Sequence, residues 1–114
     1  MTIQPLIRII PLLVLVVGLS ATAAAQATED CGPIQGTITV ADDASDFAAM
    51  AQVTEAQAQE AALGAVAGAT VVDVDLEEEY GFLVYEVDLT LDGQEREVYV
   101  DAGSGAVLCV ETED

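Results

Sequence analysis

The sequence has 114 residues, of which 21 are Asp or Glu, two are Lys or Arg and none is His, so its formal net charge is -19. This charge excludes nucleic acid as a natural partner, because phosphate binding needs clustered Lys and Arg, and it disfavours anionic membranes and acidic substrates. The absence of His and the presence of only two Cys remove the usual general base and the ligands of a structural zinc site. These features predict one small domain that is not an enzyme and that holds no cofactor or metal.

Residues 1–27 have the order of a secretory signal peptide. A segment with a single positive charge is followed by an apolar run over residues 9–19 and then by small residues with the A-x-A pattern of a cleavage site. We expect cleavage after Ala25 or Ala27, and therefore export to the periplasm or the extracellular medium. The alternative is an uncleaved membrane anchor, although the apolar run is shorter than the roughly 20 residues of a spanning helix.

The part of the chain after the signal peptide is extremely acidic. Removal of 27 residues leaves 87 residues with all 21 acids and one basic side chain, Arg96, a net charge of -20. Such a charge destabilises the compact state unless salt screens it, and acidic surfaces almost without Lys are typical of halophilic proteins. A disordered acidic segment is the weaker alternative, because 53% of the residues are hydrophobic and they alternate regularly in the C-terminal half.

The two cysteines lie near opposite ends of the mature chain. Export to an oxidising compartment favours a disulfide between Cys31 and Cys109, which would stabilise the domain by about 4 to 5 kcal/mol in the chain-entropy model. Two unpaired thiols are the alternative. A redox or nucleophilic thiol is disfavoured, since the sequence has no CxxC spacing and no His.

Local signals predict two helices in the first half of the mature chain. Residues 37–40 favour a short strand or extended arm, and residues 46–51 a short helix. The main helix begins after Thr54, which can form a capping box with Gln57, and it continues to about Val66. Its apolar face is rich in alanine and suits close packing on a sheet.

From Thr70 onward the apolar residues recur with a period of two, which predicts strands. Asp92-Gly93 is a strong signal for a two-residue hairpin turn, and Tyr80-Gly81 provides a second turn. These turns set the following apolar pairs opposite each other: Val87 with Val98, Tyr85 with Val100, Val72 with Leu89, Val74 with Val87, and Leu76 with Tyr85. A last strand over Val107–Val110 is expected to bring Cys109 to the core face. The fold class is therefore α+β: a main helix and a short preceding helix packed on one face of an antiparallel three- to four-stranded β-meander.

Several stretches of the sequence resemble the PepSY domain family. They are the helix start Val53-Thr54-Glu55-Ala56-Gln57-Ala58, residues 68–77, residues 84–87 and, most specific, Val98-Tyr99-Val100-Asp101-Ala102 with its following glycine turn. The resemblance implies a domain over residues 53–110, between an N-terminal extension, 28–52, and an acidic tail, 111–114. Members occur in propeptides of secreted metallopeptidases and as separate envelope proteins, so the resemblance implies a non-catalytic module that binds and inhibits or regulates an extracytoplasmic peptidase. The alternative is a salt-adapted envelope protein that binds divalent cations through its acidic sheet face.

The same register predicts two candidate surfaces on the sheet face away from the helix. One is a partner contact formed by Phe82, Val84 and Tyr99, together with Tyr80 of the adjoining turn. The other is a face that attracts cations, formed by Asp73, Asp75, Glu77, Glu86, Asp88 and Glu97, in which carboxylates of neighbouring strands stand opposite one another. The simpler interpretation of the acids is a solvated, salt-adapted surface, since no EF-hand spacing is present.

Overall fold

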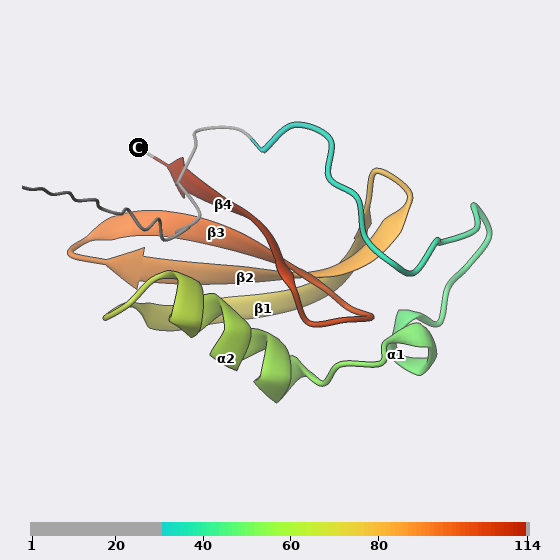
Figure 1. The fold of residues 1–114 in the computed structure, drawn as a ribbon, viewed down its shortest axis with the longest axis horizontal. Coiled ribbons are helices and arrows are strands. Elements are labelled where there is room, and N and C mark those ends of the chain that lie inside the picture. Colours follow the sequence, from blue (N-terminus) through green and yellow to red (C-terminus); the bar gives the residue numbers. More distant parts are fainter. Residues whose placement is uncertain (1–30, 114) are drawn as a thin grey trace, which may run out of the picture.

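The structure, a computed structural model, describes residues 31–113 and contains two helices and one sheet. The predicted signal peptide and cleavage site lie outside the described residues. The helices are α1 (Phe47–Met50) and α2 (Glu55–Ala65), and the strands are β1 (Thr70–Glu79), β2 (Phe82–Leu91), β3 (Gln94–Asp101) and β4 (Val107–Glu113). The strands pair in the order β1-β2-β3-β4, all antiparallel (Figure 1). The predicted α+β meander is thus confirmed.

Helix α2 begins at the predicted capping box. The Thr54 hydroxyl accepts a hydrogen bond from the Gln57 backbone N–H at 3.1 Å, and the Gln57 side chain accepts one from the Thr54 N–H at 2.8 Å. These bonds satisfy donors that the first turn of a helix leaves without partners. On the core side of the sheet, the Tyr85 hydroxyl of β2 donates to the carbonyl of Val53, just before α2, at 2.7 Å. This bond holds the start of α2 against β2. Neither α1 nor α2, the helices of the described part, is long and apolar enough to cross a membrane.

The core lies between α2 and one face of the sheet. Only Ala58, Ala62 and Val66 are buried from the helix side, and their small side chains let the helix approach the strands closely. The sheet contributes larger side chains, which alternate with outward-facing residues as the period of two requires. The buried members of this core on the strands are Leu83, Tyr85, Val87, Leu89, Val98, Val100 and Val110.

The register of the β2–β3 hairpin agrees with the prediction, whereas β1 departs from it at one position. Val74 faces Val87 and Leu76 faces Tyr85, but Leu89 faces Val71 and not Val72. A β-bulge between Val71 and Asp73 inserts one extra residue into β1, so the predicted pairing of Val72 is wrong. A bulge leaves its extra residue out of the ladder, and Val72 is accordingly 63% exposed.

The face of Cys109 was also predicted wrongly. A second irregularity, between Tyr99 and Val100, changes the phase of the β3–β4 pairing by one residue. Val107 therefore faces Val100 on the core side, whereas Cys109 faces Tyr99 on the side away from α2. The last strand still buries Val110 in the core.

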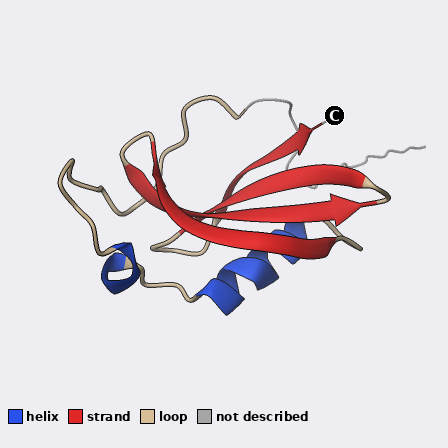
Figure 2. Cartoon of the chain, turned by 180° about the vertical axis from the view of Figure 1, so that it is seen from behind, coloured by secondary structure: helices blue, strands red, loops and turns tan. Residues whose placement is uncertain are grey.

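An N-terminal arm, residues 31–40, crosses the sheet face that α2 leaves open (Figures 1 and 2). The predicted short strand within it consists of a single bridge, in which Thr39 pairs with Phe82. Two backbone hydrogen bonds flank this bridge: the Leu83 N–H donates to the Ile38 carbonyl, and the Val40 N–H donates to the Gly81 carbonyl, both at 2.9 Å. The arm thus continues the ladder of β2 at the point where β3 ends.

Candidate functional site

The sheet face away from α2 carries a row of carboxylates on every strand. Because Leu83, Val87 and Val98 point into the core, their neighbours in the strands point to the opposite side. We call this surface the acidic face; its members are Asp73, Asp75, Glu77, Glu79, Glu86, Asp88, Glu95, Glu97, Glu111 and Glu113. Within the described residues the only basic side chain is Arg96, which pairs with Leu89 and Thr112 and so belongs to the helix side.

The structure brings together all six of the acids predicted to form one face. Asp73 lies opposite Asp88, Asp75 opposite Glu86, and Asp88 opposite Glu97, as the hairpin turns required. Sequence reasoning missed the contribution of β4, where Glu111 lies opposite Glu97 and Glu113 opposite Glu95. A signal is present in the sequence, because Glu111 and Glu113 alternate with Val110 and Thr112; β4 therefore includes most of the predicted acidic tail.

Carboxylate oxygens approach one another in two overlapping groups. The oxygens of Glu86, Asp88 and Glu97 lie within 4.8 Å of one another, and so do those of Glu97, Glu111 and Glu113. Glu97 belongs to both groups and is therefore the centre of the acidic face. Three carboxylates at this spacing can share protons or attract a cation, because like charges so close together disfavour full ionisation.

The central carboxyls hold protons more tightly than ordinary glutamates do. The pKa of Glu97 is raised to about 8, mainly by burial. The hydrogen bond and charge of Glu86 contribute next, and those of Glu113 last. Burial and the neighbouring Glu77 raise the pKa of Glu86 to about 7. Burial and the charges of Asp73 and Asp75 raise the pKa of Asp88 as well. Near neutral pH, the middle of the acidic face is thus partly protonated.

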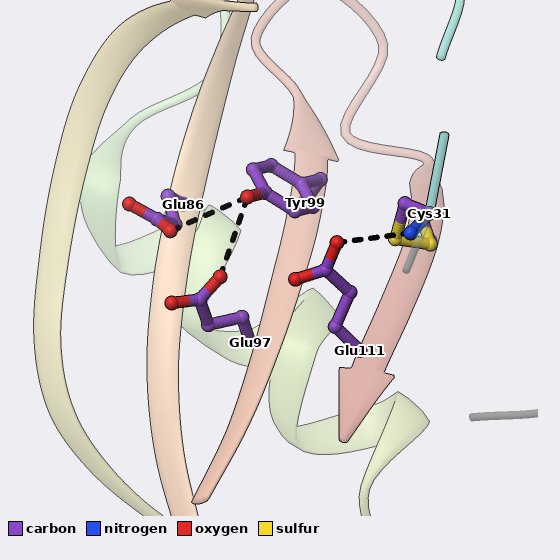
Figure 3. Close-up of a disulfide and its surroundings, with 6 residues drawn as sticks. Cys31, Glu86, Glu97, Tyr99 and Glu111 are labelled. Carbon is purple, nitrogen blue, oxygen red and sulfur yellow. Dashed lines mark hydrogen bonds between the residues drawn. A yellow bond between two sulfur atoms is a disulfide. The ribbon is translucent and has the colours of Figure 1, made fainter. Parts of the chain in front are cut away.

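Tyr99 stands between two of these carboxyls (Figure 3). Its hydroxyl lies 3.4 Å from Oε2 of Glu86 and 3.3 Å from Oε1 of Glu97. The single phenolic proton can satisfy one of these acceptors at a time. Burial and the charges of Glu86 and Glu97 raise the pKa of Tyr99, so its hydroxyl remains a donor throughout the physiological pH range.

Asp101 differs from the other acids because it is fully buried and fully bonded. It is 1% exposed, and it accepts hydrogen bonds from the N–H and hydroxyl of Thr37 in the arm and from the N–H and hydroxyl of Ser104 in the β3–β4 turn. Burial alone would raise the pKa of Asp101, but these four bonds outweigh it and lower the pKa to about 2. The carboxylate therefore joins the arm to the turn and is not available to a ligand.

The four residues of the predicted partner contact differ in their exposure to solvent. Val84 is completely buried, so its predicted exposure is wrong. Val84 lies opposite Asp101 in the sheet. The arm, which is distant in sequence, bonds to Asp101, Phe82 and Leu83 around it and so covers this part of the sheet. Phe82 and Tyr99 are half-buried, and Tyr80 is 57% exposed at the β1–β2 turn.

Cys31 and Cys109 form the predicted disulfide, with their Cα atoms 5.9 Å apart. The Cys31 N–H also donates to Oε2 of Glu111 at 2.9 Å, next to the carboxyls that surround Tyr99 (Figure 3). A small cavity of about 50 Å³ remains between the arm and the sheet. It is lined by Cys31, Gly32, Ile34, Glu79, Tyr80, Tyr99 and Glu111.

Comparison with known families gives one match. The family model of PepSY, described as peptidase propeptide and YPEB domain, matches residues 52–111. This range contains α2, the first three strands and β4 as far as Glu111, whereas the arm and α1 lie outside it. The predicted resemblance is confirmed. No curated protein matches, and no solved structure matches.

Proposed function

The chain belongs to the PepSY family, and on this premise we propose that it is a non-catalytic exported module that binds an extracytoplasmic peptidase and inhibits or regulates it. The family match carries this proposal, because its description names peptidase propeptides and it covers more than half of the chain. The disulfide supports export, since such bonds persist in oxidising compartments.

The described surface offers such a partner two kinds of contact. Tyr80 and the half-buried Phe82 lie at the β1–β2 turn, where an aromatic side chain can enter a pocket of a partner. The acidic face lies beside them and would steer a partner with a basic surface, an effect that molar salt weakens. A peptidase that works in the same saline medium would therefore depend more on the aromatic contact than on charge.

The proposal is tested by capture from the secreted fraction at native salt. The mature protein, immobilised in its disulfide form, is expected to retain a peptidase, identified by mass spectrometry and by its activity. The control is Val98→Asp, which places a charge in the core, prevents folding and should retain nothing. Deletion of the gene should change total secreted proteolysis. Recovery of no peptidase, together with unchanged proteolysis, would contradict the proposal.

The alternative function is divalent cation binding by the acidic face, and the two groups of three carboxylates are the observation that favours it. Calorimetry with calcium or magnesium in molar sodium chloride distinguishes it from general screening. A saturable isotherm that Glu97→Gln abolishes and Glu60→Gln leaves unchanged would support the alternative, because only Glu97 belongs to both groups. The absence of a saturable isotherm would contradict the alternative.

A further inference from the structure

The arm is attached to the sheet at two places that differ in chemistry. At its beginning, Cys31 is joined covalently to Cys109 of β4, and its N–H donates to Oε2 of Glu111 at 2.9 Å. Near its end, the Thr37 hydroxyl donates to Oδ2 of Asp101 at 2.7 Å, and the Ile38 carbonyl accepts from the Leu83 N–H at 2.9 Å. Of these contacts, only the disulfide depends on the redox state of the surroundings.

The segment between these attachments lies beside Tyr99. Cys31, Gly32 and Ile34 line one side of the small cavity whose other side includes Tyr99 and Glu111. Tyr99 is half-buried although it stands on the open face of the sheet, far from α2. The first part of the arm thus limits access to Tyr99 and to the carboxyls that it contacts.

We propose that residues 31–36 form a redox-operated strap over Tyr99. The strap closes when the disulfide forms after export, and it opens when a dithiol reductant breaks that bond. In the opening step the S–S bond is broken, and the dithiol supplies two electrons and two protons. Two cysteine thiols are formed, and the reductant itself becomes a disulfide. Residues 37–40 stay in place, because Asp101 and the β2 ladder hold them without any sulfur chemistry.

Opening of the strap leaves the core intact. Helix α2 and the sheet bury Tyr85, Val87 and Val98 on the opposite face, and the arm contributes nothing before Ile38 to this core. The reduced form therefore exposes more fully an aromatic ring between Glu86 and Glu97 that the oxidised form keeps half-buried. Such a ring beside carboxyls fits a partner that offers a basic side chain with an apolar stem. This inference concerns the arm alone and holds whether or not the partner is a peptidase.

The three tyrosines allow a footprinting test with an internal control. Tyr85 is 6% exposed and marks protection, whereas Tyr80 is 57% exposed and lines the same cavity as Tyr99. Hydroxyl-radical labelling is compared in molar sodium chloride between the disulfide form and Cys31→Ser/Cys109→Ser. We expect the labelling of Tyr99 to rise at least threefold, whereas that of Tyr85 remains unchanged and that of Tyr80, which is already exposed, rises less. Unchanged labelling of Tyr99 would overturn the strap, and so would a parallel rise at Tyr85, because that result means that the whole domain opens.

Hydrogen exchange of the wild-type protein provides the second measurement and needs no variant. Addition of dithiothreitol should accelerate exchange in residues 32–36 at least tenfold and leave the amides of Leu83 and of β3 unchanged. Equal exchange with and without dithiothreitol would show that the other contacts hold the segment, and the proposal would then be wrong.

Discussion

Asp88 of β2 lies directly opposite Glu97 of β3, and their carboxylate oxygens lie within 4.8 Å of each other. Asp75 likewise lies opposite Glu86 and Glu97 opposite Glu111, so like charges face each other across all four strands. Directly opposed like charges destabilise a sheet by a few tenths to about 1 kcal/mol for each pair. The fold therefore retains a repulsion that its environment must offset.

The first prediction concerns salt. The Debye length falls from about 30 Å at 0.01 M to about 3 Å at 1 M, so molar sodium chloride screens most of the repulsion on the acidic face. We expect the Tm to rise steeply between these concentrations and the double variant Asp75→Asn/Asp88→Thr to flatten that rise. The measurement is thermal unfolding followed by circular dichroism.

The matched control for the salt prediction removes the same number of charges elsewhere. Asp42 and Asp43 are exposed residues outside the sheet, and Asp42→Asn/Asp43→Asn should retain most of the salt dependence. Equal flattening by both double variants would mean that total charge, and not the pairing across the sheet, determines the effect.

The second prediction concerns pH. The pKa of Glu97 is about 8 and that of Glu86 about 7 in the folded protein, against an ordinary value of 4.5. Between pH 4.5 and 8 the folded state binds more protons than the unfolded state, so stability falls as the pH rises through this window and levels off above it. We expect the Tm to decrease from pH 5 to pH 8 at low salt, and Glu97→Gln to remove much of the decrease. If Glu60→Gln on the exposed side of α2 has the same effect, the central carboxyls are not its source.

The third prediction concerns the buried Asp101. Asn at this position would leave donors of Thr37 or Ser104 without an acceptor, so Asp101→Asn should lower the free energy of unfolding by about 3 kcal/mol. Ser104→Ala removes one hydroxyl and should cost about 1 kcal/mol. Urea unfolding in molar salt measures both. Similar small losses for the two variants would show that the four bonds at Asp101 do not act together.

The fourth prediction concerns the contact between β2 and the start of α2. The Tyr85 hydroxyl donates to the Val53 carbonyl at 2.7 Å, and Tyr85→Phe keeps the ring but removes this donor. We expect a loss of about 1 kcal/mol in the free energy of unfolding, and faster hydrogen exchange in the first turn of α2. A variant as stable as wild type would indicate that water replaces the hydroxyl.

The sequence allowed the sheet to be predicted because two tight turns fix its register and one face is apolar. The pairs of Val87 with Val98 and of Asp88 with Glu97 follow from Asp92-Gly93 alone. The errors at Val72 and Cys109 have one physical origin. A single inserted residue changes the phase of a strand locally at little cost, and the alternation on either side of it looks the same.

The candidate site was less predictable because part of it is covered by a distant segment. Alternation correctly placed Val84 on the face away from α2, but its burial depends on contacts with residues about 45 positions earlier in the chain. No local pattern in residues 31–40 indicates which strand they cross. The disulfide partners could be predicted, since the sequence has only two cysteines, yet the face on which they meet could not.

The most direct test of the central claim is a titration of secreted proteolysis with the purified mature protein at native salt. If the protein binds to the active region of a peptidase, the hydrolysis of a fluorogenic peptide should decrease and saturate. The stoichiometry at saturation should be close to one module per enzyme molecule. Val98→Asp, added at the same concentrations, should have no effect. Proteolysis that stays constant up to tens of micromolar module would contradict the assignment of this chain as a peptidase regulator.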